Sequence, residues 1–160
     1  MILFIDTTSG FTRVAFGNEV LEFTAEKQSV DLPERTKELL AGRRPAAIFV
    51  VTGPGSFTGI RLGIAYAKGL AMGFKIPLFG INLFDFSNTQ IAAIDSGSND
   101  FFVRDNGEFY IAKKLPPASE LLVGYDMKDA IKFIKNYFEK TPSVTNEVVP
   151  LYIRPSYVEK

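Results

Sequence analysis

Residues 3–10 and 91–98 have the same pattern: an apolar strand that ends in aspartate and continues into a turn of serine, threonine and glycine. The pattern gives Asp6 and Asp95 equivalent positions. Carboxylates at such places can orient a metal ion or a metal-bound water for phosphoryl chemistry, with Thr7 and Thr8 beside the first of them. Alternatively, the side chains accept hydrogen bonds from nearby backbone N–H groups and only stabilise the turns. The residues alone leave both interpretations open.

A glycine-rich turn, Gly-Pro-Gly-Ser-Phe-Thr-Gly at 53–59, joins an apolar run to a helix. Its glycines let the chain turn tightly and let another group approach the backbone closely. Thr52, Ser56 or Thr58 can cap the helix, or the free N–H groups and the helix dipole could face an anion. The turn is not a P-loop, because no Lys-Ser or Lys-Thr pair closes it and Arg61 lies inside the helix.

The helix that follows has small residues at every fourth position: Gly59, Gly63, Ala67 and Ala71. One face is therefore nearly bare, although glycine inside a helix costs about 1 kcal/mol relative to alanine. Close packing on the protein's own sheet and contact with a partner both explain this face. Arg61 is either a surface residue or a bidentate bridge to the glycine turn or to a partner's carboxylate.

The composition excludes several kinds of site. The 160 residues contain no cysteine and no histidine, so thiol and Ser-His-Asp catalysis and the commonest transition-metal ligand are absent. Eighteen basic residues balance eighteen acidic ones, so a basic excess typical of an independent nucleic-acid binder is lacking. No segment predicts a signal peptide or a membrane span, and we expect a cytoplasmic protein.

The elements that must position these residues follow from the apolar patterns. We expect strands at 1–6, 11–17, 19–25, 46–52, 76–81, 91–95, 101–104, 108–112 and 148–153, and helices at 31–40, 59–73 and 127–140. Turns at Gly17-Asn18 and Asp105-Asn106-Gly107 predict two hairpins. The sequence strand–Asp–turn–hairpin therefore occurs twice, which indicates two related α/β lobes, residues 1–82 and a smaller lobe at 83–160.

Taken together, these motifs resemble the TsaB (YeaZ) family, formerly described as glycoprotease-like. The resemblance covers residues 1–82 strongly and the second half by short islands, and it is carried by residues 5–8, 53–63, 67–69, 93–95 and 150–154. It implies an α/β fold of two ribonuclease-H-like lobes, as in the actin-like ATPase superfamily, with the second lobe reduced.

The resemblance also implies a role. TsaB-like proteins are non-catalytic partners of the TsaD subunit, which transfers a threonylcarbamoyl group to tRNA; a TsaE-like ATPase associates with the pair. By resemblance we expect no cofactor, tRNA contact only through the complex, a possible homodimer when the chain is isolated, and vestigial phosphate loops at Asp6, Thr7, Thr8 and Asp95. The expected interface comprises Leu32, Leu39, Leu40, Gly59, Ile60, Arg61, Gly63, Ile64, Tyr66 and Ala67.

The sequence departs from the family pattern in its short second lobe and in lacking a His-Ser pair before the first helix. It also lacks the metal-binding histidine pair of TsaD-like paralogues, which argues against a catalytic subunit. The alternative is an enzyme: an actin-fold ATP-dependent phosphotransferase or a peptidase-like protein.

Overall fold

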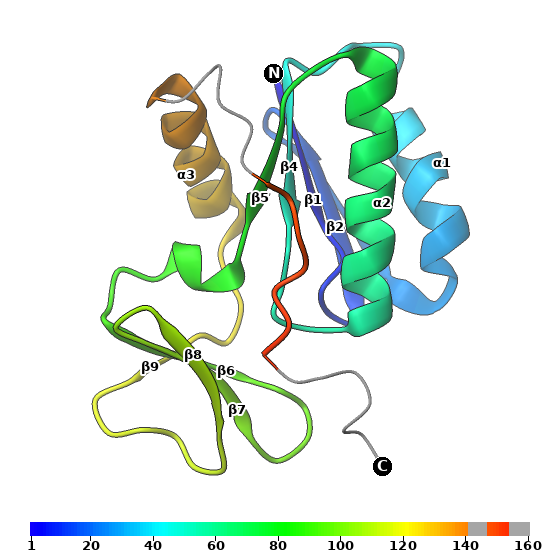
Figure 1. The fold of residues 1–160 in the computed structure, drawn as a ribbon. Helices are drawn as coiled ribbons and strands as arrows, with labels where there is room; N and C mark the ends of the chain where they lie inside the picture. The colour runs from blue at the N-terminus through cyan, green and yellow to red at the C-terminus, as the bar shows by residue number, and fades with distance from the viewer. Residues whose placement is uncertain (141–146, 154–160) are drawn as a thin grey trace.

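The computed structural model describes residues 1–140 and 147–153 and contains two sheets (Figure 1). The first is a five-stranded mixed sheet in the order β3-β2-β1-β4-β5. Its strands are β1 (Ile2–Asp6), β2 (Phe11–Phe16), β3 (Glu19–Thr24), β4 (Ala47–Val51) and β5 (Leu78–Ile81). The β1–β2–β3 meander is antiparallel, and β4 and β5 continue the sheet in parallel with β1. The central strands β1 and β4 are buried on both faces, as their unbroken apolar runs predict.

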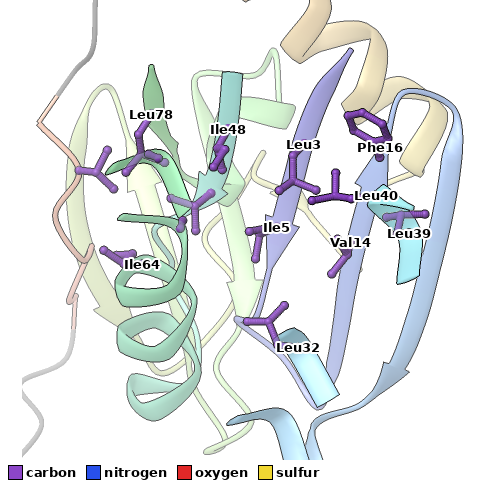
Figure 2. Packing of buried hydrophobic residues seen from close by; sticks show 14 of the residues in the cluster. Leu3, Ile5, Val14, Phe16, Leu32, Leu39, Leu40, Ile48, Ile64 and Leu78 are labelled. Atoms are coloured by element: carbon purple, nitrogen blue, oxygen red, sulfur yellow. The ribbon is translucent and has the colours of Figure 1, made fainter. Parts of the chain in front are cut away.

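Helices cover both faces of this sheet (Figure 1). On one face, α1 (Gln28–Leu40) and α2 (Phe57–Phe74) pack on side chains of β1, β2 and β4, as Figure 2 shows. On the other face, α3 (Met127–Lys140) places Ile131 and Ile134 against Phe4 and Phe49. The first lobe is therefore a three-layer helix–sheet–helix sandwich.

The second sheet has four strands in the order β8-β7-β6-β9. They are β6 (Ile91–Asp95), β7 (Phe101–Asp105), β8 (Glu108–Ala112) and β9 (Glu120–Leu121). A 3-10 turn, η2 (Leu83–Phe86), connects the two sheets, and another, η1 (Ala25–Lys27), precedes α1. As in the first sheet, the strand that ends in aspartate pairs with a following antiparallel hairpin and with a parallel strand on its other side. The predicted duplication is thus present in both sheets.

Several elements differ from their prediction: no strand was expected at β9, α2 begins two residues earlier and β5 two residues later than predicted, and three further differences affect the packing. Helix α1 begins at Gln28 rather than at residue 31, because the buried Gln28 amide donates to Thr12 Oγ1 at 2.6 Å and fixes the helix start on β2. Helix α3 follows the second sheet in sequence but packs on the first, since its apolar side fits the face that α1 and α2 leave open.

The prediction of a strand at 148–153 is wrong, because the structure has no strand within residues 147–153. This segment bonds to the first sheet through the Leu151 N–H, which donates to Thr52 O at 2.8 Å, but Pro150 has no N–H to extend a ladder. Instead the segment joins the two cores: Val148 packs in the first, and Leu151 and Ile153 pack in the second. Arg154, the last residue of the predicted family motif, lies outside the described residues.

Candidate functional site

The first aspartate turn and the glycine-rich turn form one hydrogen-bonded unit. Asp6 Oδ1 accepts from the Thr8 N–H at 2.9 Å and from Thr8 Oγ1 at 2.6 Å. The Ser56 N–H donates to Thr8 O at 2.8 Å, and Thr7 Oγ1 donates to Gly59 O at 2.7 Å. The two motifs that were most distinctive in the sequence therefore lie directly against each other.

Three glycines make this contact possible, because a residue with a Cβ atom would collide with the aspartate turn at each position. A Cβ atom would lie 2.2 Å from Thr8 O at Gly55, 2.0 Å from Thr7 O at Gly59 and 2.1 Å from Thr7 Oγ1 at Gly63. The bare face of α2 is thus occupied by the aspartate turn of the same chain. Of the two interpretations of the small-residue stripe, packing within the lobe accounts for this part. Ser56 caps the helix, accepting from the Gly59 N–H at 3.1 Å.

Asp6 is enclosed by a residue that sequence reasoning did not single out. The Tyr125 hydroxyl donates to Asp6 Oδ2, and the nearest Arg13 guanidinium nitrogen is 4.0 Å from the same oxygen. Only 1% of Asp6 is exposed. Burial, followed by the Asp6 charge, raises the pKa of Tyr125 well above its ordinary value, so the hydroxyl keeps its proton. Both carboxylate oxygens of Asp6 therefore have protein donors.

Tyr125 is held in place by aromatic packing on the linker between the sheets. Its ring stacks on Phe86 with a centroid distance of 4.6 Å and meets Phe4 edge-on. Tyr125 lies 119 residues from Asp6 in sequence, in a segment with no periodic pattern, so no local signal could have identified the pair.

Asp95, by contrast, is exposed and makes the equivalent turn. Its Oδ1 accepts from the Gly97 N–H at 2.8 Å. It borders a cleft of about 620 Å³ between the lobes, which the first aspartate turn, residues 54–58 and residues 94–98 line. None of the lining residues is lysine or arginine. Where a polyphosphate would need cations, this cleft offers hydroxyls, backbone groups and one carboxylate.

A smaller hollow of about 300 Å³ adjoins this cleft, and both Asp6 and Asp95 line it together with Arg13 and Tyr125. The fold thus brings the two predicted loops together. Among the described residues, no group of three or more His, Cys, Asp or Glu is placed to hold a metal ion.

Arg61 binds the carboxyl-terminal segment. Its Nε donates to the Tyr152 hydroxyl at 2.8 Å, and the Tyr152 ring also contacts Phe57, with centroids 5.0 Å apart. Within the described chain, Arg61 therefore bridges α2 to residues 147–153 instead of binding the glycine turn.

The residues of the predicted interface lie mainly inside the first lobe. Arg61 is exposed and Tyr66 half-buried; the others are buried, namely Leu32, Leu39, Leu40, Gly59, Ile60, Gly63, Ile64 and Ala67. The apolar stripes of α1 and α2 suggested an interface in the sequence, but in the structure these stripes pack the two helices on the sheet. The outward stripe of α2 consists of its exposed residues, Thr58, Arg61, Ala65, Lys68, Gly69, Met72 and Gly73, and 79% of Met72 is exposed.

Similar proteins carry related names. Residues 37–95 match the family described as "TsaD: tRNA N6-adenosine threonylcarbamoyltransferase". The tRNA threonylcarbamoyladenosine biosynthesis protein TsaB of Escherichia coli is 57% identical over 30 residues, which are 19% of this chain and 13% of that protein. A tRNA N6-adenosine threonylcarbamoyltransferase of Fervidobacterium nodosum is 38% identical over 72 residues, 42% of this chain and 21% of that protein. The aligned segments thus span a small part of these relatives' length.

The structural likeness extends over the whole chain. The structure of YeaZ from Pseudomonas aeruginosa matches with a TM-score of 0.67 at 16% identity, over 94% of this chain and 99% of that one. A Pseudomonas aeruginosa protein described as similar to peptidase YeaZ matches with the same TM-score, over 96% and 99%. These matches confirm the α/β fold of two ribonuclease-H-like lobes, and together with the local identity to TsaB they support the resemblance to the TsaB (YeaZ) family. No helix in the described part of the chain is long and apolar enough to cross a membrane.

Proposed function

We propose that this chain is a TsaB-type, non-catalytic partner of a TsaD-type threonylcarbamoyltransferase in the modification of tRNA. The observation that carries the proposal is the combination of local identity to TsaB with a fold match to YeaZ over nearly the whole chain. Because its role would be in tRNA modification, we further propose that the protein is cytoplasmic and that a TsaE-like ATPase joins the pair.

A non-catalytic role agrees with the chemistry of the aspartate loops. Asp6 already receives hydrogen bonds from Thr8 and Tyr125, and a metal ion or phosphate-bound water would have to displace a buried donor. Asp95 borders a cleft without a lining cation, and the adjoining hollow that it also lines contains a single cation, Arg13. We therefore interpret both loops, with Thr7 and Thr8, as structural remnants of a phosphate site.

The partner surface we propose is the outward stripe of α2 rather than the buried set. A Cβ added at Gly69 or at Gly73 would meet no atom within 4 Å, so the helix backbone is open there to close approach by another helix. The neighbouring Met72 supplies an exposed, adaptable apolar side chain. In the absence of TsaD, the same stripe could pair two copies of this chain.

The proposal is tested by reconstitution with the TsaD-type protein of the same organism. Threonylcarbamoylation of a tRNA transcript should depend on adding this chain. Gly69→Arg should abolish binding to TsaD while the variant remains folded, because a Cβ at this position meets no atom within 4 Å and the position is exposed. Asn88→Arg, at an exposed site in the linker between the sheets, is the matched control and should bind normally.

Three results would contradict the proposal. One is modification that proceeds equally well without this chain. Another is a folded Gly69→Arg variant with wild-type affinity, which would move the interface elsewhere. The third is ATP or peptide hydrolysis by the purified chain that disappears in Asp95→Asn, since it would make the protein an enzyme.

A further inference from the structure

A second concave surface lies on the opposite side of the first sheet from α2. Strand β3 extends the sheet beyond the cover of α3, so Val20 remains 40% exposed although its partner on β2, Ala15, is buried. A groove of about 700 Å³ results between α3 and the β2–β3 hairpin. It is lined by Asn18, Val20, Asp126, Met127, Lys128, Ile131, Lys132, Lys135, Asn136 and Glu139.

Three lysines form one wall of this groove. Lys128, Lys132 and Lys135 follow each other at helical spacings of four and three, which puts them on one side of α3 over about 10 Å of helix length. All three are exposed, and within the described chain none of them forms an ion pair. Lys135 Nζ donates to the Asn18 amide oxygen at 3.1 Å, which aims it across the groove.

Two lining residues of the groove are acids, Asp126 and Glu139, so its three lysines leave an excess of one positive charge. Asp126 accepts from the N–H groups of Lys128 at 2.7 Å and Asp129 at 3.2 Å, so its carboxylate caps the start of α3. Glu139 follows Lys135 by four residues, one helical turn along the same side of α3, but within the described chain the two do not form an ion pair. Because the chain has no net charge, the positive wall is a local concentration and not part of a generally basic surface.

We propose that this groove binds the phosphate backbone of RNA, and, resting on the proposed function, that the RNA is the tRNA substrate of the complex. Lysine ammonium groups are mobile point charges that bind phosphates without requiring one fixed geometry. The amides of Asn18 and Asn136 add donors beside them. The sheet separates the groove from the α2 stripe, so a partner on α2 leaves the groove open (Figure 1).

The test measures binding of a fluorescent tRNA transcript to the full chain, alone and with the TsaD-type protein, over a salt range of roughly 50 to 200 mM KCl. The groove variant combines Lys128→Gln, Lys132→Gln and Lys135→Gln. Its affinity should fall roughly ten- to a hundred-fold, and the slope of log K against log salt should become shallower by about 2–3, near one per phosphate contact. Replacing the same lysines by arginine should retain both values.

The matched control changes three exposed lysines elsewhere, Lys27, Lys37 and Lys114, to glutamine. It alters the net charge equally and should leave the affinity and the slope near wild type. Equal losses in both variants, or no loss in the groove variant, would overturn the proposal. So would unchanged tRNA binding with weakened TsaD binding, which would identify the groove as a contact for an acidic protein surface. Failure of the proposed function appears separately, as tRNA modification that does not need this chain.

Discussion

Two glycines of α2, six residues apart, should respond in opposite directions to the same substitution. Gly63 and Gly69 both lie within the helix, and alanine in place of either should gain about 1 kcal/mol of helix propensity. At Gly69 the new methyl group meets nothing within 4 Å. We therefore expect Gly69→Ala to stabilise the protein by up to about 1 kcal/mol.

At Gly63 the methyl group would lie 2.1 Å from Thr7 Oγ1 and 3.2 Å from both Thr7 Cβ and Cγ2. Rotating Thr7 away breaks its buried hydrogen bond to Gly59 O, which costs about 1–3 kcal/mol. Shifting the helix instead costs a similar amount through overpacking, about 1–3 kcal/mol. After the propensity gain of about 1 kcal/mol is subtracted, Gly63→Ala should still destabilise the protein, by up to about 2 kcal/mol.

Urea unfolding followed by circular dichroism measures both variants against the wild type. In thermal unfolding, each kcal/mol corresponds to about 2–4 °C in Tm for a domain of this size. A Thr7→Ala background provides the control, because removing the hydroxyl should reduce the cost of Gly63→Ala and leave Gly69→Ala unchanged. Equal free-energy changes for the two glycines, or no coupling between residues 7 and 63, would refute the packing of α2 on the aspartate turn.

Three further predictions concern the contacts between distant segments. Tyr125→Phe should lower the free energy of unfolding by about 1.5–3 kcal/mol, since the Asp6 carboxylate loses a charge-assisted hydrogen-bond donor. If Asp6→Asn lowered the free energy of unfolding by the same amount, the charge of Asp6, and not its hydrogen bond from Tyr125, would be what stabilises the fold. Because the folded pKa of Tyr125 is raised, the unfolded chain loses this proton first, so stability should fall as the pH rises above about 10, and less steeply in Tyr125→Phe. Tyr152→Phe should increase amide hydrogen exchange around Leu151 by releasing Arg61, whereas unchanged exchange would show that the carboxyl-terminal segment is held by its apolar contacts alone.

The local features of the fold were predictable because short-range chemistry determines them. The glycine turn, its Ser56 cap and the aspartate turns each involve residues a few positions apart, and their residue types suit few other structures. The repetition of strand, aspartate and hairpin was likewise visible as a pattern. The packing of segments that are distant in sequence could not be predicted. The amphipathic pattern of α3, for example, identifies a helix but not the sheet that the helix covers.

The same limit explains the outcome for the predicted interface. Sequence periodicity identifies the apolar stripe of a helix, but it does not say whether a sheet or a partner covers that stripe. In α2 the small and apolar positions 60, 63, 64 and 67 are buried in the lobe, and what remains for a partner is the weaker outward pattern around Gly69 and Met72. For the partner surface that we propose, the signal is thus Gly69, which no close contact requires, rather than Gly63, which packs against Thr7.

The two aspartates show how the environment decides between chemistry and structure for the same residue type. Both end a strand, and both accept a hydrogen bond from the N–H two residues later. Asp6 also accepts a hydrogen bond from the Tyr125 hydroxyl and is buried, while Asp95 is exposed at the cleft. A carboxylate buried among protein donors stabilises a fold, whereas one that remains exposed with unused lone pairs can take a ligand. If this protein does bind a small cation or a sugar hydroxyl in its cleft, Asp95 is therefore the residue that would contact it, and Asp95→Asn should weaken that binding without changing the stability.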